Sequence, residues 1–368
     1  MTFHCSAIRN NIRIVGNHDT GTRILPCCVY KTTQNYQTLD EYYSSSEYQS
    51  LLTATDWPTG CQRCRVQEQS NQTSYRNQFN HSLASTELVR YEIFPSNICN
   101  LKCVMCNSES SSALAQERRQ IPIFNNHQTG EFDLSEECLS ILQEQANIES
   151  ISFLGGEFFL AKGNLELLDF ILERNLPCRI VTNATVLEPK LLNKLTQLKQ
   201  LELQISIDGF ETSYEFLRYP ANWQKFSNNV AQLIASLKQA NINFHFVAQP
   251  LNIQNLIPTL DWCNRHRKPT RVTNLVEPNW LGWGILLPDE QVLLEQVIQA
   301  QFEQYTLTNK QKTFILNLVS TIKNTQHSSE LRAKFINLMS QTLKHRNVSA
   351  PQTTQQLGVL STLSNALV

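Results

Sequence analysis

Three features are missing from this 368-residue sequence, and each absence argues against a class of protein. No stretch approaches the roughly 18 consecutive apolar residues that a membrane-spanning helix needs. The first residues, MTFHCSAIRNNIRIVG, lack the basic start and the apolar run of a secretory signal peptide. The formal net charge is −1, so the broad positive field that attracts nucleic acids or anionic membranes is also missing. We therefore expect a cytoplasmic protein that binds neither nucleic acid nor membrane.

Cysteine, by contrast, is abundant, with eleven residues in the chain. In a reducing compartment, clustered cysteines bind metal more often than they form disulfides. Eight of them fall before residue 107, in two groups: Cys5, Cys27, Cys28, Cys61 and Cys64, then Cys99, Cys103 and Cys106. The other three have apolar neighbours in the sequence, and we expect them to be buried, inert thiols: Cys138, Cys178 and Cys263.

Hydrophobic periodicity after residue 88 alternates strands with helices. The six predicted strands are 88–94, 148–154, 178–183, 201–207, 242–249 and 270–276, and the predicted helices between them are 135–146, 164–175, 189–198, 222–240 and 257–266. This order predicts an α/β fold with a parallel sheet, either doubly wound or a partial (β/α)6 TIM-type barrel. Further helical periodicity from residue 289 predicts a helical C-terminal region that caps the open side of the barrel.

Polar and glycine residues follow the predicted strands, where ligands bind in folds of this kind. In chain order they are Cys99, Cys103 and Cys106; Gly155, Gly156 and Glu157; Asn183; Ser206, Asp208 and Gly209; and Gln249 and Asn252. For several of these residues a purely structural role remains an alternative. The two glycines suit a bend, Asp208 and Gly209 suit a turn, and Asn183 suits an Asx turn.

Three cysteines spaced CxxxCxxC raise a question of ligand number. A structural zinc ion takes four ligands, although part of a zinc knuckle remains an alternative here. A cubane iron–sulfur cluster held by three thiolates has one iron open to an outside ligand.

This loop, together with the motifs behind it, resembles the radical S-adenosylmethionine (radical SAM) enzymes over about residues 86 to 280. Cys99, Cys103 and Cys106 match the cluster loop of that superfamily. Gly155, Gly156 and Glu157 match its glycine-rich motif, which receives the amino group of the cofactor. Ser206 and Asp208 match positions that often meet the cofactor ribose or carboxylate. Asn183 and Arg218 are further candidates for cofactor binding, although Arg218 also suits a local salt bridge.

The resemblance implies a [4Fe-4S] cluster whose open iron chelates S-adenosylmethionine. One electron then cleaves the sulfonium bond and gives a 5′-deoxyadenosyl radical, which abstracts hydrogen from the substrate. Met105 departs from the aromatic residue that often precedes the last cysteine, and we expect methionine to substitute with little loss.

The first group of cysteines resembles an N-terminal twitch (SPASM-like) domain, over about residues 4 to 80. By that resemblance Cys5, Cys27, Cys61 and Cys64 hold an auxiliary iron–sulfur cluster, with Cys28 as a substitute for Cys27. Zinc in the same thiolates remains an alternative. The predicted domains are the twitch domain at 1–82, the radical SAM partial barrel at 86–285 and the helical region at 286–368.

The same branch of the superfamily implies a maturase that modifies a ribosomally made precursor peptide. The most specific prediction is a splicease, which excises a tyramine unit and leaves an α-keto-β-amino acid. A peptide epimerase with Cys263 or Cys28 as its hydrogen donor, a crosslinking maturase and a radical SAM enzyme for a small molecule are alternatives, as is a non-enzymatic scaffold. Such maturases also depend on a reductant such as ferredoxin or flavodoxin. We expect a small leader-recognition partner of the RRE type, because nothing before the twitch domain reads as a winged-helix module.

Overall fold

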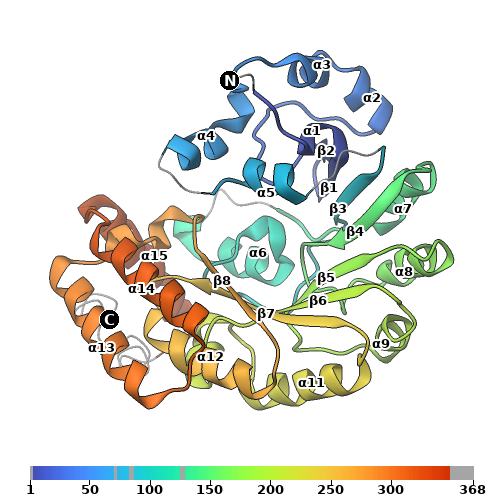
Figure 1. Ribbon diagram of the computed structural model, residues 1–368. Helices are drawn as coiled ribbons and strands as arrows, with labels where there is room; N and C mark the ends of the chain where they lie inside the picture. The colour runs from blue at the N-terminus through green and yellow to red at the C-terminus, as the bar shows by residue number, and fades with distance from the viewer. Residues whose placement is uncertain (1–2, 70–72, 83–86, 125–128, 349–368) are drawn as a thin grey trace.

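The computed structural model describes residues 3–69, 73–82, 87–124 and 129–348. One curved sheet of eight strands organises this part of the chain, in the order β2-β1-β3-β4-β5-β6-β7-β8 (Figure 1). The strands are β1 Asn11–Asn17, β2 Gly21–Leu25, β3 Val89–Phe94, β4 Ile148–Phe153, β5 Cys178–Thr182, β6 Leu201–Ser206, β7 Asn241–Ala248 and β8 Thr270–Asn274.

Strands β3 to β8 pair in parallel with their neighbours throughout. The helices that join or follow them are α6 Ser112–Arg119, α7 Ser135–Gln143, α8 Asn164–Glu173, α9 Pro189–Leu195, α10 Thr212–Leu217, α11 Trp223–Ser236 and α12 Leu256–Arg265. Helices α7, α8, α9 and α11 run along the outer face of the sheet (Figure 1). The predicted partial (β/α)6 barrel is confirmed, and each predicted strand matches an observed one to within two residues at either end.

The outer face of the sheet carries the main hydrophobic core. Side chains alternate along a strand, so every second residue of β3 points to the helices: Val89, Tyr91 and Ile93 are all buried there. Cys138, Cys178 and Cys263 lie fully buried in the same core, as the sequence predicts. The opposite, inner face carries polar side chains such as Arg90 and Glu92, which line a cavity inside the barrel.

The N-terminal region is not a separate sheet. Strand β1 pairs in parallel with β3, with Asn11 opposite Arg90, and β2 folds back against β1, with Leu25 opposite Arg13. An edge strand exposes unpaired backbone groups, and β1 satisfies those of β3. The domain boundary between residues 82 and 86 therefore stays a prediction, and the sheet continues across it.

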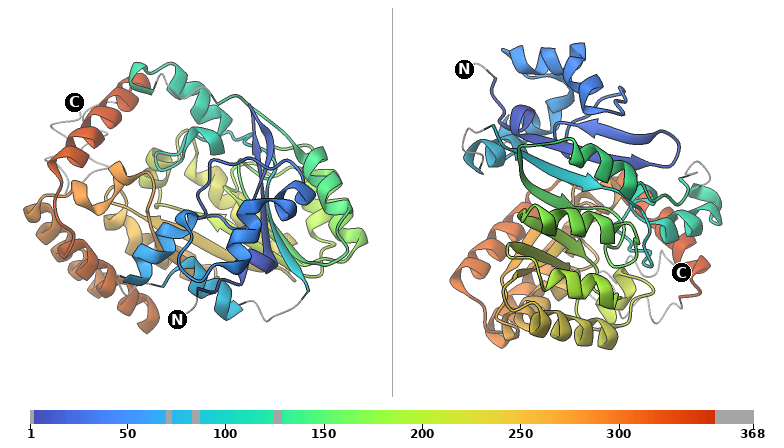
Figure 2. Two further views of the ribbon diagram at one scale, coloured as in Figure 1. Left: turned by 90° about the horizontal axis from the view of Figure 1, so that it is seen from above. Right: turned by 90° about the vertical axis from the view of Figure 1, so that its right-hand side faces the viewer.

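Short helices complete the N-terminal region: α1 Ala7–Asn10, α2 Leu39–Ser44, α3 Ser46–Thr53, α4 Gln62–Gln69 and α5 Tyr75–Ser82. They gather at the side of the sheet that β2 and β1 form, as the turned views also show (Figure 2). Two of them begin with capping hydrogen bonds: the Thr38 side chain accepts from the Glu41 N–H at α2, and the Ser45 side chain accepts from the Tyr48 N–H at α3.

The C-terminal region contains α13 Pro288–Gln304, α14 Asn309–Lys323 and α15 Ser329–His345, and lies beside β8 (Figure 1). Its buried side chains form a second core with α12 and with the segment 279–286. The helical C-terminal region is thus confirmed up to residue 348, and residues 349–368 lie outside the described part of the chain. In the described ranges, no helix combines the length and the apolar character that crossing a membrane requires.

Candidate functional site

The loop after β3 places three half-buried cysteines, Cys99, Cys103 and Cys106, near one another. Burial raises the pKa of the Cys99 thiol to about 12, and it also raises the pKa of Cys103 and of Cys106. The neighbouring thiols add to the shift, since Cys106 raises the pKa of both Cys99 and Cys103. Each thiol therefore resists ionisation unless a cation binds to it.

Backbone hydrogen bonds fix the middle of this cysteine loop. The Lys102 N–H donates to the Tyr219 carbonyl at 2.6 Å, and the Val104 N–H donates to the Leu217 carbonyl at 2.9 Å. The Cys106 N–H closes a turn onto the Cys103 carbonyl at 3.0 Å. The segment that follows β6 thus holds the peptide groups on both sides of Cys103.

Gly155 and Gly156 lie directly against the start of the cysteine loop. The Gly156 N–H donates to the Ser96 carbonyl at 2.9 Å, and a Cβ at Gly156 would come within 2.3 Å of the Ile98 carbonyl oxygen. Gly155 has a φ of +97°, which side-chain-bearing residues rarely adopt. The bend is thus present, and it brings Glu157 against the loop, where the Glu157 N–H donates to the Ile98 carbonyl at 2.7 Å.

Glu157 is 1% exposed and follows the two glycines. Its Oε1 accepts hydrogen bonds from Thr182 Oγ1 at 2.5 Å and from the Phe159 N–H at 3.2 Å. Its Oε2 accepts one from the Asn183 N–H at 2.6 Å. Burial raises the pKa of this carboxyl to about 7, against the lowering effect of these donors. Its Oε2 accepts only that one hydrogen bond among the described residues, which leaves capacity for a further donor.

Asn183 joins β5 to the cysteine loop. Its Oδ1 accepts from the Thr185 N–H at 2.9 Å, which makes the expected Asx turn. Its Nδ2 lies 3.2 Å from Asn100 Oδ1 and 3.8 Å from Cys99 Sγ. The turn and a contact with the cysteine loop thus occur together.

Asp208 and Arg218 form a buried ion pair below Cys103. Asp208 Oδ2 lies 2.5 Å from Arg218 Nη2, and Asp208 Oδ1 accepts from the Val247 N–H at 2.7 Å. Burial alone would lower the pKa of Arg218, but Asp208, Cys103 and Tyr214 together outweigh it and raise that pKa. Arg218 Nη1 is 4.0 Å from Cys103 Sγ. The local salt bridge considered for Arg218 is therefore present, and it directs the guanidinium to a cysteine of the loop. Ser206 lies at the end of β6, on the strand that leads to Asp208.

Several polar atoms nearby have no hydrogen-bond partner within the described ranges. Gln249 is fully buried after β7, and neither its Oε1 nor its Nε2 has a hydrogen-bond partner in these ranges. The hydroxyl of Tyr214, which is also fully buried, has no partner among the described residues either. Arg218 Nε is a third such atom. Buried polar groups in folded proteins normally have partners, so these atoms fit a polar ligand at this edge of the barrel.

Four of the N-terminal cysteines line one cavity: Cys5, Cys27, Cys61 and Cys64. Aromatic side chains close its walls, among them Phe3, Tyr30, Trp57 and Phe79. Burial, and then the neighbouring thiols Cys5 and Cys64, raise the pKa of Cys61 to about 12.

Cys28 does not line that cavity. Its electrostatic neighbours are Glu92, Arg13 and Arg63, and burial together with Glu92 raises its pKa to about 11. Cys27 and Cys28 lie in the bend and turn that follow β2, and of the two only Cys27 lines the cavity.

A half-buried network supports the N-terminal cavity. Arg76 donates from Nε to Glu68 Oε1 at 2.9 Å and pairs also through Nη2 and Glu68 Oε2. Its guanidinium lies 4.9 Å from the Trp57 ring centroid and donates to the His4 carbonyl at 2.8 Å. The hydrogen bond with Glu68 raises the pKa of Arg76 and keeps a positive charge beside the thiols.

In the described ranges, no group of three or more His, Cys, Asp or Glu side chains has the arrangement of ligands around a single metal ion. The thiolates of a cubane bind different irons, so they lie farther apart than the ligands of one ion. The donors near the loop suit such a cluster, because the Leu101 N–H is 3.5 Å from Cys99 Sγ and Arg218 approaches Cys103.

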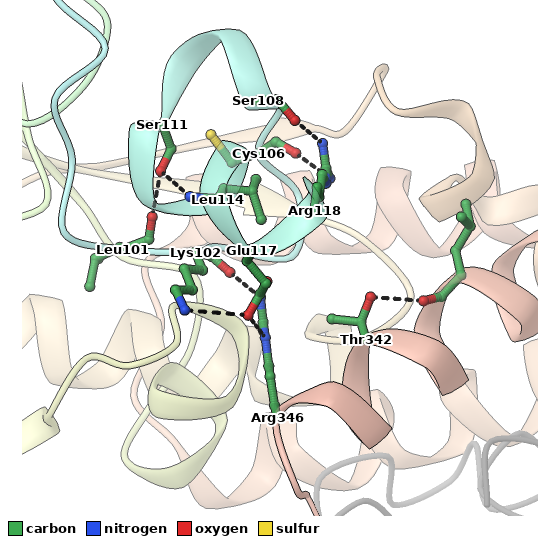
Figure 3. Close-up of polar contacts among 11 residues, drawn as sticks. Leu101, Lys102, Cys106, Ser108, Ser111, Leu114, Glu117, Arg118, Thr342 and Arg346 are labelled. Atoms are coloured by element: carbon green, nitrogen blue, oxygen red, sulfur yellow. Dashed lines mark hydrogen bonds and ion pairs between the residues drawn. The ribbon is translucent and has the colours of Figure 1, made fainter. Parts of the chain in front are cut away.

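Sequence reasoning did not single out three residues that shape the loop: Glu117, Arg118 and Arg346. Arg118 Nη2 donates to the Cys106 carbonyl at 3.0 Å (Figure 3). Arg346 comes from the far end of the chain, and no local pattern links it to residues 229 positions earlier.

Comparison with known proteins gives the following matches. The sporulation killing factor maturation protein SkfB of Bacillus subtilis (strain 168) is 27% identical over 161 residues, which are 43% of this chain and 35% of SkfB. The match therefore spans about a third of that relative. SuiB of Streptococcus suis bound to S-adenosylmethionine has a TM-score of 0.38 at 19% identity, over 59% of this chain and 45% of SuiB. Native anSMEcpe with bound AdoMet has a TM-score of 0.42 at 21% identity, over 58% of this chain and 61% of that one.

The radical SAM superfamily matches residues 93–263, from the end of β3 into α12. This range includes the three loop cysteines, Glu157, Asn183 and the Asp208–Arg218 pair. Residues 93–263 of this chain form a radical SAM domain.

Proposed function

We propose that this chain is a radical SAM enzyme that modifies a ribosomally made precursor peptide. One observation carries the first part: three cysteines gather at the carboxyl edge of the barrel, beside Glu157 and Arg218, inside the matched domain. The similarity to SkfB, a maturation protein, supports the second part.

In this proposal Cys99, Cys103 and Cys106 hold a [4Fe-4S] cluster through their thiolates, which lose their protons when iron binds. When bound, the cluster supplies an electron that cleaves S-adenosylmethionine, and the resulting 5′-deoxyadenosyl radical abstracts hydrogen from the substrate. The Leu101 N–H and the Asn183 amide stabilise the Cys99 thiolate, and Arg218 does the same for Cys103.

Other residues position the cofactor. Glu157 would accept hydrogen bonds from its amino group through Oε2, which accepts only the Asn183 N–H among the described residues. Each carboxylate oxygen of Asp208 already has a partner, Oδ2 in Arg218 and Oδ1 in the Val247 N–H, so its role is to orient Arg218. The unpaired atoms of Gln249 and Tyr214, with Ser206, remain for the polar groups of the cofactor.

We propose an auxiliary iron–sulfur cluster in the N-terminal cavity, with Cys5, Cys27, Cys61 and Cys64 as its ligands, in a twitch-type domain. Support comes from the single cavity that these four thiols line and from its aromatic walls, which keep water away. Zinc in the same four thiolates is the rival occupant.

The specific reaction that we propose is the excision of a tyramine unit, which leaves an α-keto-β-amino acid in the peptide. A peptide epimerase has less support, because its candidate donor Cys28 lies by Glu92 of the cavity at the amino ends of the strands, away from the loop cysteines at their carboxyl ends. Cys263 does not suit that role, since it is fully buried in the outer core. The precursor peptide with a small leader-recognition protein and ferredoxin or flavodoxin as reductant complete the proposed system.

Anaerobic reconstitution tests the proposal. Iron and sulfide are quantified, S-adenosylmethionine and dithionite are added, and 5′-deoxyadenosine is measured. Two cubanes per chain with deoxyadenosine release are expected, whereas zinc without deoxyadenosine would contradict the function. Mass spectrometry of a precursor peptide encoded beside the gene then separates excision, which lowers the mass, from epimerisation, which leaves it unchanged in ordinary water and adds deuterium in D2O.

A further inference from the structure

A buried ion pair connects the last turn of the C-terminal region to the cysteine loop (Figure 3). Arg346, at the end of α15, donates from Nε to Glu117 Oε1 at 2.9 Å and from Nη2 to Glu117 Oε2 at 2.6 Å. The side chains of Arg346 and Glu117 are 3% and 1% exposed. Two charges removed from water in this way require close partners, and this two-pronged geometry supplies them.

The same guanidinium reaches the backbone of the cysteine loop. Arg346 Nη2 donates to the Lys102 carbonyl at 2.7 Å, one residue before Cys103. The Lys102 N–H in turn donates to the Tyr219 carbonyl, and the Tyr219 ring lies 4.8 Å from the Arg346 guanidinium carbon. Arg346, Lys102 and Tyr219 therefore form a closed set of contacts that holds both the N–H and the carbonyl of Lys102, the residue before Cys103.

Helix α6 completes the support from the other side of the loop. Glu117 and Arg118 are neighbours on α6, and Arg118 donates to the Cys106 carbonyl at 3.0 Å and to Ser108 Oγ at 3.3 Å. Lys102 Nζ also lies 3.7 Å from Glu117 Oε1. Glu117 is thus the point at which α6, α15 and the loop meet.

Helix α15 itself is firmly held. Phe335, Leu338, Met339 and Leu343 are buried in the second core. Near its start, Arg332 pairs with Glu290 of α13 at 2.8 and 3.0 Å and donates to the Ile285 carbonyl at 2.8 Å. The position of Arg346 is therefore set by the packing of the whole C-terminal region.

We propose that Arg346 is a positioning residue for the cysteine loop, and that the C-terminal helices are in this way part of the cluster-binding site. The cluster itself belongs to the proposed function, on which this inference rests. Arg346 acts through Glu117 and the Lys102 carbonyl.

The first test needs no cluster. Hydrogen–deuterium exchange of the metal-free protein is followed in peptides that cover residues 99–107, where the N–H groups of Lys102, Val104 and Cys106 are hydrogen-bonded. Arg346→Gln should raise their exchange by about tenfold, because these bonds then open locally without global unfolding. Arg346→Lys retains the charge without the two-pronged geometry and should give an intermediate rate.

Arg332→Gln is the matched control, since it removes an ion pair and a bond to a backbone carbonyl from the same helix, away from the loop. The inference is overturned if exchange in the loop is unchanged in Arg346→Gln, or if Arg332→Gln raises it equally. If Arg346→Gln does not fold, as judged by circular dichroism, the comparison of Arg346→Lys with Arg332→Gln decides in the same way.

The second test uses the reconstituted protein. The midpoint potential and the electron paramagnetic resonance signal of the reduced loop cluster should change in Arg346→Gln and not in Arg332→Gln. Wild-type protein that binds no iron at the loop would contradict the proposed function, while the exchange result would still stand. An altered exchange rate with an unaltered potential and spectrum would overturn the claim that Arg346 acts on the cluster.

Discussion

The N-terminal cysteines and those of the barrel loop differ in how far apart they lie in the sequence and in what surrounds them. The N-terminal four come from separate segments between residues 5 and 64, and aromatic side chains enclose them. The loop cysteines fall within eight residues, and backbone hydrogen bonds and buried ion pairs hold them. The first set thus depends on the folding of distant segments, whereas the second depends on the conformation of one short loop.

The largest effect should come from the loop. Cys103→Ala removes one of the three proposed ligands and should reduce 5′-deoxyadenosine to background while circular dichroism stays native, because a three-thiolate cluster has no spare ligand. Cys178→Ala is the control, since Cys178 is buried in the outer core. Full turnover by Cys103→Ala would contradict the proposal that the loop cysteines bind the cluster that cleaves S-adenosylmethionine.

A smaller effect should come from the N-terminal set. Cys61→Ala should lower iron by about half, from about eight to about four per chain, if each site holds one cubane. Metal analysis of reconstituted protein measures this directly. Unchanged iron would mean that these thiols hold zinc or no metal, and the contrast between two iron sites would disappear.

Neighbouring Cys27 and Cys28 sharpen the comparison within the N-terminal set. Cys27 lines the cavity and Cys28 does not, so Cys27→Ala should lose auxiliary iron while Cys28→Ala retains it. Iron content and the visible absorption of both variants provide the measurement. Equal losses would show that the two thiols share one ligand position.

The smallest effect concerns acid stability of the barrel interior. Burial lowers the pKa of His245, on β7, from its ordinary 6.5 to about 4. Between these values the unfolded chain binds the proton and the folded chain does not, so this histidine makes stability fall as the pH drops from 6.5 toward 4. The free energy of unfolding of the wild type should thus fall by on the order of 2 kcal/mol over this pH range, and His245→Gln should not show this fall. Urea unfolding at pH 7 and pH 4.5 tests it, and an equal loss in variant and wild type would contradict the assignment.

The strands of the barrel were predictable because their information is local. The alternating pattern of 201–207 and the apolar periodicity of 222–240 need no tertiary context, and both elements are present. The loop cysteines and Glu157 were predictable for a related reason, since residues after parallel strands share one edge.

The rest depends on contacts between distant segments. The pairing of β1 with β3 joins residues about eighty positions apart, and the bond from Arg346 to the Lys102 carbonyl spans 244. The choice between Cys27 and Cys28 depends on which side of one short segment each thiol faces. No local periodicity encodes any of these.

The parallel register of β1 and β3 sets the distance between the two groups of cysteines. The N-terminal thiols adjoin the start of β1 and the end of β2, whereas the loop cysteines follow the end of β3, so the two sets lie at opposite ends of the same strands. Six residues of β3 extend about 20 Å at about 3.3 Å per residue. The length of β3 therefore gives the separation of the two sets of thiols along the sheet. If a substrate peptide contacted both ends of this strand, about six extended residues of the peptide would be needed.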